Sequence, residues 1–206
     1  MGLEIFTGEY ASTLKEGIEE AEYIDSDLKV VNSFLLANNI QQHVEPKVLP
    51  EVELSCASGF PYCFLHYLRR VYALNVLGKE VSPVSGELTE EDKDLINQVY
   101  EVFESHLLCH SDNEGYYVPI AFEDVIADEE LPGIMLGSTQ TLLKEIIEIS
   151  SFIGVEVIDG EISNVTRAEL IAAEVEHPFY PERLVWFSLY EHCKNSLKNK
   201  TVISFD

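Results

Sequence analysis

The stretch GFPYCFLHYLRRVYALNVLG, residues 59–78, decides the fold of this chain. Pro61 suits the first turn of a helix, because its φ is already helical and an N–H has no partner there, and Gly78 is a typical helix end. Between them, apolar side chains recur at helical spacing in a broad stripe. These side chains are Phe64, Leu65, Leu68, Val71, Tyr72 and Val76. We therefore expect a central helix.

The same stretch carries His66, Arg69 and Arg70 on one side of the expected helix. The sequence has only four arginines, so two adjacent ones on an apolar helix are unusual. A guanidinium at the edge of a core needs a carboxylate, and Asp112 or Glu114 would suit a bidentate pair. We expect an internal ion pair that holds a loop. The alternative is a pocket in which Arg69 or Arg70 binds a small acidic ligand.

Further helix-start signals lie on both sides of the central stretch, where capping boxes, prolines and turn residues precede apolar residues at helical spacing. They stand at Thr13, Thr89, Gly137, Thr166 and Pro181. Short strands are expected over residues 52–54, 116–122, 155–158 and 201–205. Roughly six or seven helices with four or five short strands, in irregular order, predict a predominantly helical α+β fold with a small sheet.

Length and composition predict one domain over residues 1–206, with residues 79–88 as a candidate flexible loop. The four cysteines form no C-x-x-C pair, and no apolar segment with a basic flank begins the chain. We therefore expect reduced thiols and a cytoplasmic location. The longest apolar run is interrupted at residues 59–61 and stops at Arg69, so we expect no membrane-spanning helix.

The charge balance is the most unusual global feature of the sequence. There are 37 acidic against 13 basic residues, a formal net charge of −24. Such a chain repels the phosphates of nucleic acids and the headgroups of anionic membranes, so we expect neither as a partner. Acidic surplus suits a cationic partner, metal ions or solubility alone. The composition does not indicate an oligomeric state.

A second stretch, HLLCHSDNEGYYVP over residues 106–119, has the residue types of a metal site. On a helix, His106 and His110 would share one face and could bind zinc with an acidic oxygen from the following turn. However, Leu107 stands where the H-E-x-x-H motif has its glutamate. On a strand, the two histidines would lie about 13 Å apart and could not share an ion. We favour the strand, and we expect no metal.

Two other chemistries of this stretch are less well supported by its spacing. An EF-hand register with Gly115 sixth puts His110 first and Ala121 twelfth, where calcium needs acidic ligands. On a strand, Cys109 points away from its neighbour His110, so the two cannot form a nucleophile–base pair. We expect no cofactor and no catalytic residue, and the chain is more consistent with a protein that is not an enzyme.

A resemblance connects the two stretches. It is carried by Gly59-Phe60, His66, Arg69 and the motif Ser111-Asp112-x-Glu114-Gly115 followed by an aromatic residue. These short motifs resemble a pattern in small bacterial proteins of uncharacterised function, and they cover a minor part of the chain. The resemblance implies no activity. It does imply that the His66–Arg69 helix and the Asp112–Glu114 turn belong to one feature.

Two functions remain open from the sequence. The first is an acidic, non-enzymatic protein that binds a basic protein partner, as inhibitors and immunity proteins do. No Lys or Arg occurs between Lys93 and Lys144, so the acids of this segment create a local negative field. The expected partner-binding residues are Asp112, Glu114, Glu123, Asp124, Asp128, Glu129 and Glu130.

The second function is an enzyme or a small-ligand binder. Its pocket would be formed by His66, Arg69, His110, Asp112 and Glu114. This hypothesis predicts that the five side chains converge around one cavity.

Overall fold

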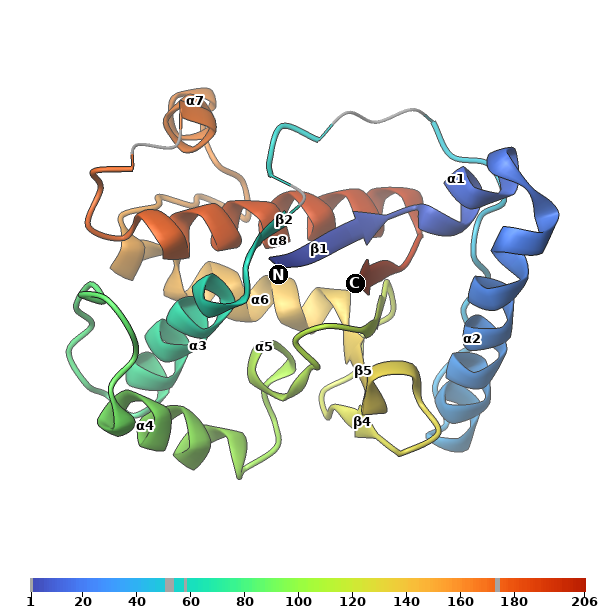
Figure 1. The fold of residues 1–206 in the computed structure, drawn as a ribbon, viewed down its shortest axis with the longest axis horizontal. Helices are drawn as coiled ribbons and strands as arrows, with labels where there is room; N and C mark the ends of the chain where they lie inside the picture. Colours follow the sequence, from blue (N-terminus) through green and yellow to red (C-terminus); the bar gives the residue numbers. More distant parts are fainter. Residues whose placement is uncertain (1, 51–53, 58, 173–174) are drawn as a thin grey trace.

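The computed structural model describes residues 2–50, 54–57, 59–172 and 175–206, and the strand expected over residues 52–54 falls largely outside them. In this part of the chain, eight α-helices accompany a six-stranded mixed sheet (Figure 1). The expected predominantly helical α+β class is therefore confirmed. No helix of the described part is both long enough and apolar enough to span a bilayer.

The sheet brings the two ends of the chain together. Its strands are β1 (Gly2–Thr7), β2 (Gly59–Pro61), β3 (Gly115–Val118), β4 (Ile126–Ala127), β5 (Met135–Ser138) and β6 (Ile203–Phe205). Their order is β2-β1-β6-β3-β5-β4, so β1 and β6 are neighbours (Figure 1). Among the described pairs only β3 and β5 run parallel. There Gly137 is required, because a Cβ at this position would lie 2.2 Å from Cδ1 of Tyr117.

Helices pack on both faces of the sheet. They are α1 (Glu9–Glu16), α2 (Ile18–Ala37), α3 (Tyr62–Val76), α4 (Glu90–Tyr100), α5 (His106–Cys109), α6 (Thr139–Ile149), α7 (Asn164–Ala172) and α8 (Tyr180–Asn199). Tyr117 belongs to the core formed with α3, α6 and α8, whereas its neighbour Tyr116 belongs to the core formed with α2. Alternation along β3 therefore assigns successive side chains to opposite cores.

Most expected helices are present, with shifted starts in two cases. The central helix is confirmed as α3, in which Leu65, Leu68 and Val71 are buried. Thr89 caps α4 as expected. The start expected at Thr13 is wrong, because α1 begins at Glu9. α7 begins at Asn164, and the hydroxyl of Ser163 accepts from the N–H of Thr166.

The strands differ more from expectation. The strand expected over residues 116–122 is β3, which ends at Val118 because Pro119 has no N–H for a ladder. The segment 155–158 forms only an isolated bridge, between Ile158 and Glu161. The C-terminal strand is confirmed as β6. β1, β2, β4 and β5 were not predicted from the sequence, and residues 59–61 were expected to open the helix that follows β2.

The strand favoured for residues 106–110 is wrong, since the segment forms the short helix α5. The Ser105 hydroxyl accepts from the N–H of Leu108 at 3.1 Å. The carboxylate of Glu145, on α6, accepts from the N–H groups of His106 at 2.9 Å and Leu107 at 2.7 Å. Free N–H groups of a first helical turn need such partners. Ser105 supplies one partner locally, but the partner of the other two N–H groups lies nearly forty positions away, where the local pattern could not indicate it.

Candidate functional site

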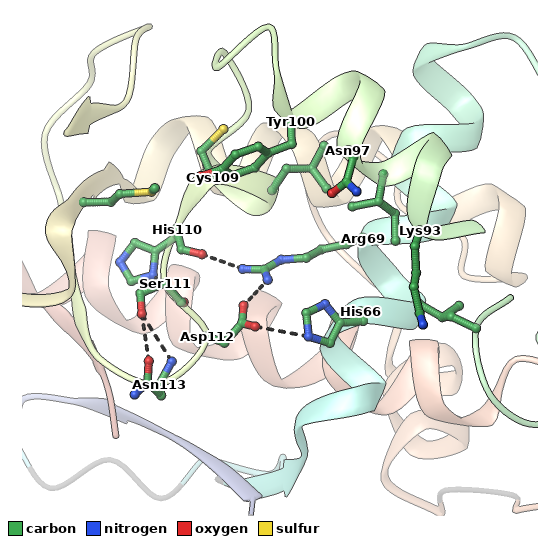
Figure 2. Close-up of a pocket in the computed structure, with 14 residues that line it drawn as sticks. His66, Arg69, Lys93, Asn97, Tyr100, Cys109, His110, Ser111, Asp112 and Asn113 are labelled. Atoms are coloured by element: carbon green, nitrogen blue, oxygen red, sulfur yellow. Dashed lines mark hydrogen bonds and ion pairs between the residues drawn. The ribbon is translucent and has the colours of Figure 1, made fainter. Parts of the chain in front are cut away.

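Arg69, from the middle of α3, is buried and organises the segment that follows α5. Its Nε donates to the carbonyl of Leu107 at 2.8 Å, and Nη2 donates to the carbonyl of His110 at 2.7 Å. Nη1 forms an ion pair with one oxygen of Asp112. The second oxygen of Asp112 lies 3.1 Å from Nε2 of His66, one turn earlier on α3 (Figure 2). We call His66, Arg69 and Asp112 the clasp.

The clasp keeps Asp112 ionised. Burial raises the pKa of this carboxyl, but the hydrogen bond from His66 and the adjacent guanidinium of Arg69 lower it more, so the pKa lies well below its usual range. Both carboxylate oxygens are engaged. Although Asp112 was among the residues expected to bind a partner, its charge is already compensated inside the fold.

Arg70, the neighbour of Arg69, serves another element. Its Nε pairs with Asp92, at the start of α4, and its Nη1 donates to the carbonyl of Ser82 at 2.8 Å. The hydroxyl of Tyr67 donates to the carbonyl of Gly86 at 2.9 Å. Side chains of α3 therefore hold the connection over residues 79–88 against this helix. Arg70 takes no part in the clasp.

Both histidines of the second stretch are committed to backbone groups. His106 accepts from the N–H of Ser138 through Nδ1 at 2.8 Å, so its Nε2 donates to the carbonyl of Glu123 at 2.9 Å. The His110 ring stacks on Tyr117 with 4.0 Å between centroids, and burial lowers its pKa to about 4. Although α5 is helical, neither ring is free for a metal. Within the described residues, no group of three or more His, Cys, Asp or Glu side chains could hold one.

A pocket of about 690 Å³ lies between α3, α4 and the chain after α5 (Figure 2). We call it the α3/α4 pocket. Its polar lining includes His66, Arg69, Lys93, Asn97 and Asp112, and its apolar lining includes Leu88, Ile96, Leu108 and Met135. Cys109 also lines it, but burial raises the pKa of this thiol to about 11, so the nucleophilic thiolate is scarce.

Glu114 lies on the other side of the 111–115 turn. Of the five residues expected to share a cavity, His66, Arg69, His110 and Asp112 line the α3/α4 pocket, and Glu114 does not. It lines a separate pocket of about 430 Å³.

We call this second cavity the acidic pocket, because Glu9, Asp27 and Asp206 also line it and no basic side chain does. Burial and the nearby charge of Glu114 raise the pKa of Asp27. Tyr116 donates to Asp27 at 2.9 Å, and Ser204 donates to Glu9. Sequence reasoning missed these three acids, because they come from α1, α2 and the last residue and no local motif connects them.

The remaining expected partner-binding acids flank the outer strand β4. We call them the acidic arm: Glu123, Asp124, Asp128, Glu129 and Glu130. All five are exposed, and none forms an ion pair with a described residue. The base of the arm is fixed, since the carbonyl of Glu123 accepts from His106 and the N–H of Asp128 donates to the carbonyl of Ile134 at 2.9 Å.

The four arginines of the chain are used inside the fold. Arg69 and Arg70 pair with Asp112 and Asp92. Arg167 pairs with Glu191 at 2.5 Å. Arg183 contacts the His177 ring at 3.0 Å and the carbonyl of Gly154. The acids of the arm therefore have no guanidinium to neutralise them.

Comparison with known proteins identifies a family. Residues 1–205 match the model of a family described as "Putative DNA-mimic protein". No curated protein and no solved structure matches the chain. Because the match spans nearly the whole sequence, the chain belongs to this DNA-mimic family.

Proposed function

We propose that the protein presents a DNA-like negative surface to a basic DNA-binding protein and so competes with DNA for that partner, without catalysing a reaction. The family description supports a DNA-mimic role. The net charge of −24 supports a partner of opposite sign. The finer part of the proposal is the location of the surface, which we assign to the acidic arm and Glu114.

One observation carries this assignment: the acids of the arm are exposed and unpaired, whereas Asp112 in the same segment is compensated. A protein that binds DNA neutralises phosphates with Lys and Arg and gains from the release of their counterions. A row of free carboxylates offers the same cations an alternative anion. Electrostatic attraction of this kind also accelerates the encounter of the two proteins.

The test removes charge from the arm without removing volume. The full chain, and its variant Asp128→Asn/Glu129→Gln/Glu130→Gln, are immobilised and exposed to an extract of the cells in which the protein occurs. Bound proteins are eluted with short duplex DNA and identified by mass spectrometry. We expect DNA-binding proteins in the eluate of the natural chain, and about tenfold less of them from the variant, as for the loss of three favourable charge contacts.

A matched control carries Glu156→Gln, Glu169→Gln and Glu176→Gln, three exposed acids of the segment 156–176. This segment contains α7, which lies far from β4 in Figure 1. Its net charge equals that of the arm variant, so it should retain the same proteins as the natural chain. Equal loss in both variants would show that total charge matters and the arm does not. An eluate without DNA-binding proteins would contradict the proposal as a whole.

A further inference from the structure

We infer that the α3/α4 pocket binds a small organic anion with a flat apolar body. The inference does not depend on the proposed function, because none of the acidic arm residues lines this cavity. A volume of about 690 Å³ lies within the range of cavities that hold small organic ligands. Such cavities combine a mostly apolar wall with a few polar groups that orient the ligand.

The apolar wall is formed by side chains of two helices and of β5. Leu108 is buried and Ile96 half-buried, and Met135 closes the cavity from β5. The Tyr100 ring also lines the pocket and meets Phe103 edge-to-face at 5.9 Å between centroids. An aromatic or alkyl body would replace water over this surface, which supplies the main favourable term.

The opposite end of the cavity carries the cationic side chain of Lys93, beside the imidazole of His66. In Figure 2, His66 and Lys93 lie toward one side of the pocket, and Tyr100 and Cys109 lie toward another. Within the described part of the chain, Lys93 forms an ion pair only with Glu90, at 2.6 Å, and the side chain of Glu90 is 88% exposed. Exposed pairs of this kind contribute little to stability, so a ligand carboxylate can replace Glu90 at low cost.

The charges of the lining explain why the ligand is an anion. Among the described residues, Asp112 is the only carboxylate that lines the cavity, and both its oxygens are engaged by Arg69 and His66. A cationic ligand therefore has no free acceptor of charge there. Lys93 remains as a cationic donor for a ligand carboxylate, since the Nε2 of His66 already faces Asp112.

The floor of the pocket is rigid before any ligand binds. Three donations from Arg69 hold the backbone of Leu107 and His110 and the side chain of Asp112. A preorganised site loses little conformational entropy on binding, which favours affinity for a small ligand.

The experiment is an NMR titration of the full chain with phenylacetate and octanoate. Phenylacetamide and benzylamine serve as uncharged and cationic counterparts. We expect the carboxylates to bind, with shift changes confined to α3, α4 and residues 108–113, and the amide and amine to bind at least about tenfold more weakly. Absence of binding by both carboxylates at millimolar concentration, or equal binding of benzylamine, would overturn the inference.

Two variants localise the effect. Lys93→Gln should weaken binding of the carboxylates about tenfold, whereas Lys144→Gln, which alters an exposed lysine on α6, should not change it. Asn97→Trp fills the cavity from the exposed face of α4 and should abolish binding. If the Trp variant does not fold, the comparison of Lys93→Gln with Lys144→Gln alone tests the assigned site. Equal effects of these two lysine variants contradict the assigned site.

Discussion

Asp112 and Glu114 stand two residues apart on one turn, and their carboxylates lie in different surroundings. Asp112 enters the clasp, where a buried guanidinium and an imidazole engage both oxygens. Glu114 is exposed, and the acidic pocket that it lines contains no base. The acids of the acidic arm resemble Glu114, because they are also exposed and pair with no described base. On this turn, the acid that meets a cation from α3 therefore serves the fold, and the acid with no cation in reach stays exposed.

The largest effect should follow from removal of the cation of the clasp. Arg69→Met keeps an apolar stem but deprives the carbonyls of Leu107 and His110, and the carboxylate of Asp112, of their donor. We expect the free energy of unfolding to fall by about 3 kcal/mol or more, as for other broken buried ion pairs. Urea unfolding followed by circular dichroism measures it. Arg69→Lys keeps the charge but not the three donations, and should recover only a small part of the loss.

Neutralisation of the two neighbouring acids compares the two environments directly. Asp112→Asn should lower the free energy of unfolding by about 2 kcal/mol, less than Arg69→Met because the side chain of Asp112 is 38% exposed. Glu114→Gln should leave it within about 0.5 kcal/mol of the natural chain. The same urea series measures both. Similar losses in the two variants would mean that the clasp and the acidic surface do not differ as described.

The pH dependence of stability should come from buried groups. Burial lowers the pKa of His110 and of His192 to about 4. Between about pH 6.5 and 4 the unfolded chain therefore binds protons that the folded chain does not, and these two residues make folding less favourable as the pH falls. Glu145 opposes them, because burial raises its pKa to about 7 and the folded chain holds its proton from about pH 7 down to 4.5.

His192→Gln isolates one of these contributions. Nε2 of His192 is buried without a partner in the described structure, so the imidazole cannot be protonated at low cost. Urea midpoints measured between pH 7 and 4.5 should decline less steeply in the variant than in the natural chain. Parallel curves would exclude His192 as a source of the pH dependence.

The smallest effect on stability is expected for the arm variant Asp128→Asn/Glu129→Gln/Glu130→Gln. These side chains are exposed and pair with no described cation. The free energy of unfolding, measured by thermal unfolding, should therefore stay within about 0.5 kcal/mol of that of the natural chain. A slight gain is consistent with reduced repulsion among the acids. A clear loss would show that the arm contributes to the fold, which would remove the contrast with the clasp.

The elements that could be predicted from the sequence carry their signals locally. Pro61 and the apolar stripe mark α3, and Thr89 with Asp92 caps α4. Elements that depend on distant groups could not be predicted. The helix α5 relies on Glu145, and β5 relies on the close approach of Gly137 to Tyr117. Strands of two to four residues, such as β4, carry too few side chains for a periodic pattern.

The same distinction applies to the candidate site. A carboxylate partner for Arg69 could be predicted, because an unpaired buried guanidinium is costly, and Asp112 was one of the two residues suggested as this partner. Which arginine it would meet did not follow, since Arg69 and Arg70 are adjacent and pair with different elements. The acidic pocket was not predictable, because its carboxylates from α1, α2 and the end of the chain meet only after the sheet has formed.

The internal use of all four arginines has a consequence for ionic strength. Exposed charges are screened within about 8 Å at physiological salt and within about 3 Å at 1 M, whereas partly buried pairs such as Arg69 and Asp112 are screened much less. Added salt should therefore release a partner held by the arm well before it weakens the clasp. Between these two limits lies a range of salt concentration in which the protein is fully folded and free, so a simple salt step would recover it intact from its complex.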